Sequence, residues 1–172
     1  MSAILIANAP NYDKKQALKG LSDPFCQDDF EKDVKKRNPD GSISEGTLSM
    51  CFSAPTSIKN CTEAQTADGI LKRSIELKKP LTKKYAEYGA KTLHTAVPLM
   101  KKGTTVHLRK GFNVFLVVVL TSDYYFRTVD GMPLHSWDYR VIKHVSYKYA
   151  MRKTFCENAT KLKPVDPALM ML

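Results

Sequence analysis

The chain has 172 residues, of which 43% are hydrophobic and 26% are charged, and its formal net charge at pH 7 is +10. This length suits one domain, and the apolar content excludes global disorder. No run of about 18 apolar residues occurs, which argues against a membrane-spanning helix. Residues 1–50 carry a net charge of −1 and residues 51–172 a net charge of +11. A folded part with this field attracts phosphate-bearing partners, either nucleic acid or anionic lipid.

The N-terminus and the cysteines bear on the cellular compartment. The first seven residues lack the basic start and the long apolar stretch of a signal peptide. The four cysteines include no Cys-x-x-Cys pair, so we interpret them as small buried side chains in a reducing compartment. They are Cys26, Cys51, Cys61 and Cys156.

The domain organisation follows from prolines and charge. Residues 1–45 are predicted to form a flexible N-terminal arm, because Pro10, Pro24 and Pro39 interrupt them. A short helix over residues 28–36 is possible, and residues 38–42 carry a dense turn signal. Residues 46–172 are predicted to form a basic α+β domain. The C-terminal residues 163–172 either dock on this domain or offer an apolar hook to a partner.

One strand and two helices are expected in the first half of this domain. Partial alternation over residues 46–52 predicts the strand. Thr62 and Gln65 fit a capping box, which starts a helix that Pro80 closes. Its apolar face comprises Ala67, Ile70, Leu71 and Ile75. The second helix ends near Pro98, and its apolar stripe comprises Leu81, Tyr85, Tyr88, Leu93 and Ala96.

The second half changes to a strand period. Residues 104–109, 112–120 and 124–129 predict a three-stranded antiparallel meander, whose middle strand is apolar on both faces. Residues 137–153 fit a helix and a strand about equally well, and we favour the helix. The predicted fold class is therefore α+β, with an antiparallel β-sheet, two or three helices packed on it, and the flexible arm.

The search for chemistry finds no catalytic or metal-binding motif. The nucleophile, phosphate-loop, zinc-protease and EF-hand signatures are all missing. The four histidines lie far apart, without a neighbouring ligand at metal-binding spacing; they are His94, His107, His135 and His144. We therefore expect a protein that is not an enzyme and holds no cofactor or metal, with an unrecognised type of enzyme as one alternative.

The strongest functional feature is a series of basic pairs. Residues 59–110 carry twelve Lys and Arg against four Asp and Glu, a net charge of +8. Lysines predominate, which suits diffuse attraction to phosphate more than readout of bases. The bland alternative is that these residues are ordinary solvated helix faces. The candidate residues for nucleic-acid or membrane binding are Lys72, Arg73, Lys78, Lys79, Lys83, Lys84, Lys101, Lys102, Arg109 and Lys110.

Aromatic residues near these charges offer little for base recognition. Tyr124, Tyr125 and Phe126 beside Arg127 could stack on bases, but their place in a strand favours core packing. No sequence signature of an RNA-binding module is present. Sequence-specific readout is not expected.

In its order of features the chain resembles the rhabdovirus matrix proteins, in particular the short ones of plant-infecting cytorhabdoviruses. The resemblance covers residues 46–155 and rests on a basic body, a strand followed by helices, and an apolar hairpin. It includes Arg109-Lys110-Gly111 before residues 112–120, then Pro133 and Trp137-Asp138. The chain departs from many animal-virus members because it lacks Pro-Pro-x-Tyr; Ala9-Pro10-Asn11-Tyr12 is a degenerate form. This puts budding through that motif in doubt.

The resemblance implies a viral structural protein found in the virion and, in the host cytoplasm, peripherally on membranes. It implies self-association, condensation of the nucleocapsid and contact with the inner face of an anionic membrane, with an envelope glycoprotein tail as a further candidate partner. The alternative is a non-specific RNA-binding accessory protein of a virus, for example a silencing suppressor.

Overall fold

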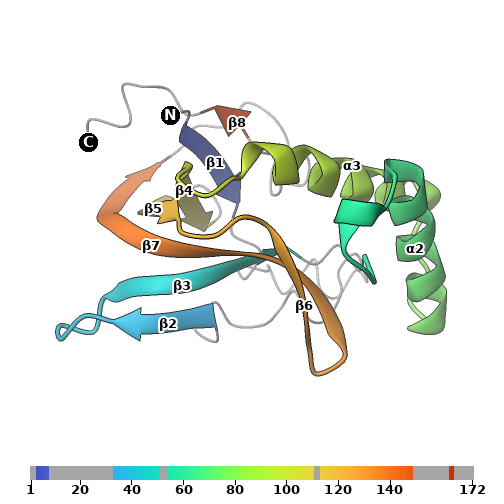
Figure 1. Cartoon of the computed structure of the whole chain (residues 1–172), viewed down its shortest axis with the longest axis horizontal. Helices are drawn as coiled ribbons and strands as arrows, with labels where there is room; N and C mark the ends of the chain where they lie inside the picture. Colours follow the sequence, from blue (N-terminus) through green and yellow to red (C-terminus); the bar gives the residue numbers. More distant parts are fainter. Residues whose placement is uncertain (1–2, 8–32, 51–53, 111–112, 149–162, 165–172) are drawn as a thin grey trace.

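The structure is a computed structural model that describes residues 3–7, 33–50, 54–110, 113–148 and 163–164. These residues form strands and helices that are arranged as in Figure 1. The strands are β1 (Ala3–Ala7), β2 (Val34–Arg37), β3 (Ile43–Met50), β4 (Thr105–Lys110), β5 (Asn113–Leu120), β6 (Tyr125–Val129), β7 (Met132–Lys148) and β8 (Lys163–Pro164). The helices are η3 (Ile58–Asn60), which is a 3-10 helix, α2 (Glu63–Glu76) and α3 (Lys83–Leu99).

Within the described residues the strands form one sheet in the order β2-β3-β7-β5-β4-β1-β8, with β6 paired to β7. The strand pairs are antiparallel, apart from the parallel pair of β1 and β4. The helices α2 and α3 pack on one face, where their buried side chains meet those of the central strands. The predicted α+β class, with helices packed on an antiparallel sheet, is confirmed.

Parts of the predicted N-terminal arm lie in this sheet. β1 pairs with β4, and β2 pairs with β3 through the predicted turn, in which Asn38 N–H donates to the carbonyl of Ser42 at 2.8 Å. The predicted boundary between residues 45 and 46 therefore falls inside β3. Residues 34–36 are a strand and not part of a short helix. Residues 8–32 and 165–172 lie outside the described part, so the flexibility of the arm and the role of the tail stay predictions.

The helix predicted for residues 137–153 is wrong over residues 137–148, because these belong to the long strand β7, and residues 149–153 lie outside the described part. Its pairing with β3 runs from His135 opposite Met50 to Arg140 opposite Glu45. Along its other edge, β7 pairs first with β6 and then with β5. The predicted meander is therefore also corrected, because β6 lies beside β7 and not beside β5. Partners on both edges bind the backbone of β7 in its extended form.

The loop between β5 and β6 lies where the pairing of β7 changes from β6 to β5. Thr121 N–H donates to the carbonyl of Asp138 at 2.8 Å, and Asp138 N–H donates to Ser122 Oγ at 2.8 Å. Both backbone groups of Asp138 are thus satisfied between the ends of two strands. This contact fixes the Asp138 side chain, which projects from the opposite face of the sheet to the core residues Trp137 and Tyr139.

The helices form as the local sequence predicts, although their buried faces share only Ala67, Ile70, Leu93 and Ala96 with the predicted apolar stripes. Thr62 and Gln65 make the capping box at the start of α2. The buried face of α3 has mainly small side chains: Ala86, Gly89, Ala90, Thr92, Leu93 and Ala96. At the end of α3, Trp137 Nε1 donates to the carbonyl of Met100 at 2.8 Å, which ties the helix to β7.

Candidate polyanion-binding surface

The end of α2 has a backbone geometry that displays lysines. Lys78 has a φ of 54°, in the left-handed region. Lys79 N–H donates to the carbonyl of Ser74 and Lys78 N–H to that of Ile75, each at 2.9 Å. These two bonds define a Schellman motif, in which glycine is the usual residue at the left-handed position. A lysine there costs about 1 kcal/mol relative to glycine.

Side-chain hydrogen bonds fix the turn between the two helices, residues 77–82. The buried Ser74 hydroxyl donates to the carbonyl of Leu71 at 2.7 Å and accepts from Leu81 N–H at 3.2 Å. Thr82 then caps α3 by accepting from Tyr85 N–H at 3.2 Å. The turn is therefore held at both ends, and its exposed side chains stand on a defined backbone.

Five exposed lysines surround this turn, and we call them the lysine cluster: Lys72, Lys78, Lys79, Lys83 and Lys84. Residues 72–84 carry six Lys and Arg and one Glu, a net charge of +5. Among the described residues, the ion pair within this cluster joins Lys83 Nζ to Glu87 Oε1 at 3.8 Å, between two exposed side chains. Such an exposed ion pair contributes little free energy, so another anion can readily take the place of Glu87. The cluster therefore presents a nearly uncompensated positive surface.

The other predicted binding residues do not join this cluster. Arg73 is 9% exposed and its Nη2 donates to Met132 Sδ at 3.2 Å, so its placement on an exposed binding face is corrected. Lys101 and Lys102 are exposed beyond the far end of α3, a helix of 17 residues that is about 25 Å long. Arg109 and Lys110 end β4, and their side chains lie outside the described part. The predicted surface is thus divided, with its densest part at the turn.

Two apolar side chains stand among the lysines. Ile75 is 68% exposed and Leu77 is 40% exposed. The helical period predicted Ile75 on the core face, and this prediction is wrong. The face does bury Ala67 and Ile70, but Ile75 lies in the last turn of α2, where it stays exposed to solvent. Ile75 lies between Lys72-Arg73 and Lys78-Lys79, but no sequence signal shows where along α2 the core ends.

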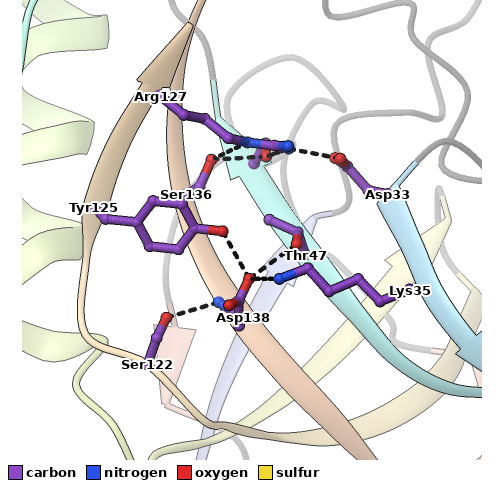
Figure 2. Close-up of polar contacts among 9 residues, drawn as sticks. Asp33, Lys35, Thr47, Ser122, Tyr125, Arg127, Ser136 and Asp138 are labelled. Atoms are coloured by element: carbon purple, nitrogen blue, oxygen red, sulfur yellow. Dashed lines mark hydrogen bonds and ion pairs between the residues drawn. The ribbon is translucent and has the colours of Figure 1, made fainter. Parts of the chain in front are cut away.

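A second group of polar side chains lies on the opposite face of the sheet (Figure 2). Asp138 Oδ1 accepts from Lys35 Nζ at 2.7 Å, from Tyr125 Oη at 2.7 Å and from Thr47 Oγ1 at 2.9 Å. Burial by itself raises the pKa of the Asp138 carboxyl, but the three hydrogen bonds and the Lys35 charge outweigh it and hold that pKa below its ordinary value. Burial and the bond to Asp138 raise the pKa of Tyr125 to about 12.

Arg127 forms the other half of this group. Its Nη2 donates to Asp33 Oδ1 at 2.5 Å and to Ser49 Oγ at 2.9 Å, and its Nε donates to Ser136 Oγ at 3.0 Å. The two cations are therefore paired with the two carboxylates inside the group. Asp33 directly precedes β2 and Lys35 lies in it. The group therefore holds this edge strand against β3, β6 and β7. We interpret it as structural.

The aromatic residues considered for base stacking are engaged in the fold. Tyr124 is 3% exposed and its hydroxyl lies 2.7 Å from His135 Nδ1. Phe126 packs against the core, and Tyr125 belongs to the polar group. Core packing is therefore confirmed for Tyr124 and Phe126, whereas Tyr125 is half-buried in the polar group on the opposite face of the sheet.

Neither metal binding nor a spanning helix emerges from the described segments. Within them, no three His, Cys, Asp or Glu side chains gather where they could hold a metal ion. None of their helices has the length and hydropathy needed to cross a bilayer. Comparison of the chain with family models, with known proteins and with solved structures gives no match. The arguments for function therefore come from the chain itself.

Proposed function

We propose that the protein is a non-enzymatic, polyanion-binding protein that acts as a viral matrix protein. In this role it self-associates, condenses the nucleocapsid and contacts the inner membrane surface. The observation that carries the proposal is the lysine cluster, with five exposed cations on and beside the α2–α3 turn and one weak ion pair among the described residues. Such a surface attracts phosphate groups by a field that salt screens.

The chemistry of the surface favours phosphate over bases. A lysine ammonium is a point charge without the planar fork that reads a guanine edge or a carboxylate. Arg73, the arginine of this region, is engaged with Met132. Tyr124, which could have stacked on a base, is buried. We therefore expect binding to RNA without preference for sequence.

Salt dependence tests this proposal. If the five lysines each neutralise one phosphate, log affinity for single-stranded RNA should fall with log salt with a slope of roughly −3.5. Homopolymers of different base should bind alike at equal salt. Affinity that is unchanged between low and moderate salt would contradict the proposal, as would a strong preference for one base.

A matched pair of variants tests the location. Replacing Lys78, Lys79, Lys83 and Lys84 with Ala should leave the melting temperature nearly unchanged, because exposed charges contribute little to stability. It should weaken binding to anionic vesicles about a hundredfold or more, since each basic residue contributes about 1 kcal/mol at an anionic membrane surface. The control replaces Lys101 and Lys102, which lie beyond the far end of α3. An equal loss of binding free energy per replaced lysine in both variants would argue for a diffuse field and against the lysine cluster.

The matrix role requires self-association, which separates it from the alternative of an RNA-binding accessory protein. Sedimentation velocity at rising protein concentration, with and without RNA, measures it. Versions that lack residues 1–45 or 165–172 test whether the predicted arm or tail makes the contact. A protein that stays monomeric at high concentration and low salt would favour the accessory role.

A further inference from the structure

The exposed apolar side chains of this chain are concentrated at the α2–α3 turn. Across the described residues, four large hydrophobic side chains are exposed: Ile75, Leu77, Leu99 and Ile142. Two of them lie within three residues of one another at the turn, and Ile75 has the largest exposed fraction of the four, 68%. A single exposed hydrophobic residue is ordinary, but a pair that stands among five exposed cations points to a contact.

The apolar pair is flanked along the chain by the lysine cluster. Lys72 precedes it on α2, Lys78 and Lys79 follow it directly, and Lys83 and Lys84 begin α3. The left-handed backbone at Lys78 reverses the chain directly after Leu77, which brings both helix ends to the same turn. The surface therefore combines branched apolar groups with cations that have long, flexible stems. Lysines of this kind can keep their ammonium groups in the headgroup layer while their stems lie along apolar surface.

We infer that the α2–α3 turn is a membrane-docking tip, which inserts Ile75 and Leu77 below the headgroups of an anionic lipid surface while the lysine cluster binds the phosphates. This inference rests on the proposed function and selects anionic lipid as the partner of the cluster. Interfacial segments use the same combination, with a basic polar side and a small apolar side that enters the boundary of the acyl chains.

The observations favour lipid over the other polyanion. An RNA backbone satisfies the lysines, but it gives no apolar environment to Ile75 and Leu77. A second copy of the same tip would bring two positive clusters together, and like charges at such a contact are repulsive. A bilayer surface meets both requirements at once, because it carries phosphates above an apolar layer.

The turn is built to enter a surface without refolding. The Ser74 hydroxyl and the Thr82 cap hold residues 77–82 from both helices. The side chains at the tip therefore lose little backbone entropy when they dock, compared with a disordered segment that must order on binding. The strained position of Lys78 agrees with a contact role, because a glycine would fit the backbone better but would remove one cation.

Co-sedimentation with vesicles tests the inference. The probes are vesicles of phosphatidylcholine with phosphatidylserine, vesicles of phosphatidylcholine alone, and a single-stranded RNA of mixed sequence. The test variant carries Ile75→Ser and Leu77→Ser, which keep every charge, and the control carries Ile142→Ser at the other exposed site on β7. The test variant should bind the anionic vesicles at least about tenfold more weakly than the parent, while its RNA affinity and melting temperature stay the same. The control should match the parent.

The outcomes separate this inference from the proposed function. Anionic vesicle binding that is equal in the parent and the Ile75/Leu77 variant would overturn the docking tip and leave the lysine cluster in place. RNA binding without vesicle binding would also overturn it, and would favour the RNA-binding alternative. If the parent binds neither probe at low salt, the proposed function itself fails.

A fluorescence measurement gives an independent readout of insertion. The native Trp137 is fully buried, so a Leu77→Trp variant adds one exposed reporter at the tip. Its emission should shift to the blue on anionic vesicles and be quenched by lipids brominated on the acyl chain. Emission that stays unshifted while the protein co-sediments would show that the tip remains outside the bilayer, which contradicts the inference.

Discussion

The buried His135 gives the chain a defined dependence of stability on pH. Its Nε2 lies 3.1 Å from the carbonyl of Ala54, and its Nδ1 lies 2.7 Å from the Tyr124 hydroxyl, which in turn accepts from Ile58 N–H at 3.2 Å. A carbonyl can only accept, so the proton of the neutral ring is on Nε2 and Nδ1 accepts from Tyr124. This chain of bonds ties the segment before α2 to β7, and protonation of Nδ1 removes the acceptor of the Tyr124 hydroxyl proton.

The size of this pH dependence follows from the pKa of His135. Burial, together with the nearby charge of His94, outweighs the bond to Ala54 and lowers the pKa of His135 to about 4 from the ordinary 6.5. As the pH falls, the unfolded chain therefore takes up the proton at a higher pH than the folded chain does. The contribution of neutral His135 to the free energy of unfolding is full above pH 6.5 and is lost as the pH falls toward 4. Between pH 7.5 and 5.0 this one residue lowers the free energy of unfolding by about 2 kcal/mol.

Urea unfolding at these two pH values measures the effect in the parent, in His135→Gln and in His144→Gln. The loss between pH 7.5 and 5.0 should be smaller in His135→Gln by about 2 kcal/mol. His144→Gln is the comparison variant, because its side chain is exposed. NMR of the imidazole nitrogens in the parent should show a ring protonated on Nε2 and still neutral at pH 5. A ring that titrates near 6.5 would refute the reasoning.

Three substitutions test the structural account further. Lys78→Gly should raise the free energy of unfolding by about 0.5–1 kcal/mol, because it relieves the left-handed backbone, and should weaken binding to anionic vesicles. Asp138→Asn should lower the free energy of unfolding by about 1–2 kcal/mol and speed amide exchange in β2, since three donors lose their charged acceptor; unchanged urea unfolding and exchange would contradict this. Gly46→Ala should cost about 1–3 kcal/mol in thermal unfolding, because its Cβ would stand 2.6 Å from Tyr139 Cζ; a melting temperature equal to that of the parent would mean that Tyr139 can move.

The features that the sequence predicted well depend on local interactions. The capping box of Thr62 and Gln65 joins residues three apart, and the turn at residues 38–42 is closed by its own backbone. The strands near residues 104–109, 112–120 and 124–129 follow from β-branched and aromatic content, although their order in the sheet does not. Local propensity carries no information about which distant strand lies alongside.

The features that it missed depend on partners far along the chain. Residues 137–148 fit two periods equally well, and pairing with β3 and β5 made them a strand. Asp138 meets Thr47 across 91 positions and Arg127 meets Asp33 across 94, so no motif could indicate the polar group. The lysine cluster was partly predictable, because its members lie within residues 72–84 of the chain. The exposure of Ile75 was not, because it depends on where the core ends.

The most direct test of the polyanion-binding surface is NMR mapping with a ligand that carries phosphate and nothing else. Short-chain polyphosphate, added to the ¹⁵N-labelled full chain at low salt, contains neither bases nor acyl chains. The account predicts that the largest amide shift changes fall on residues 72–84 and disappear as salt is raised. Shift changes centred on Lys101 and Lys102 or on the β2–β3 turn, with residues 72–84 unaffected, would contradict it.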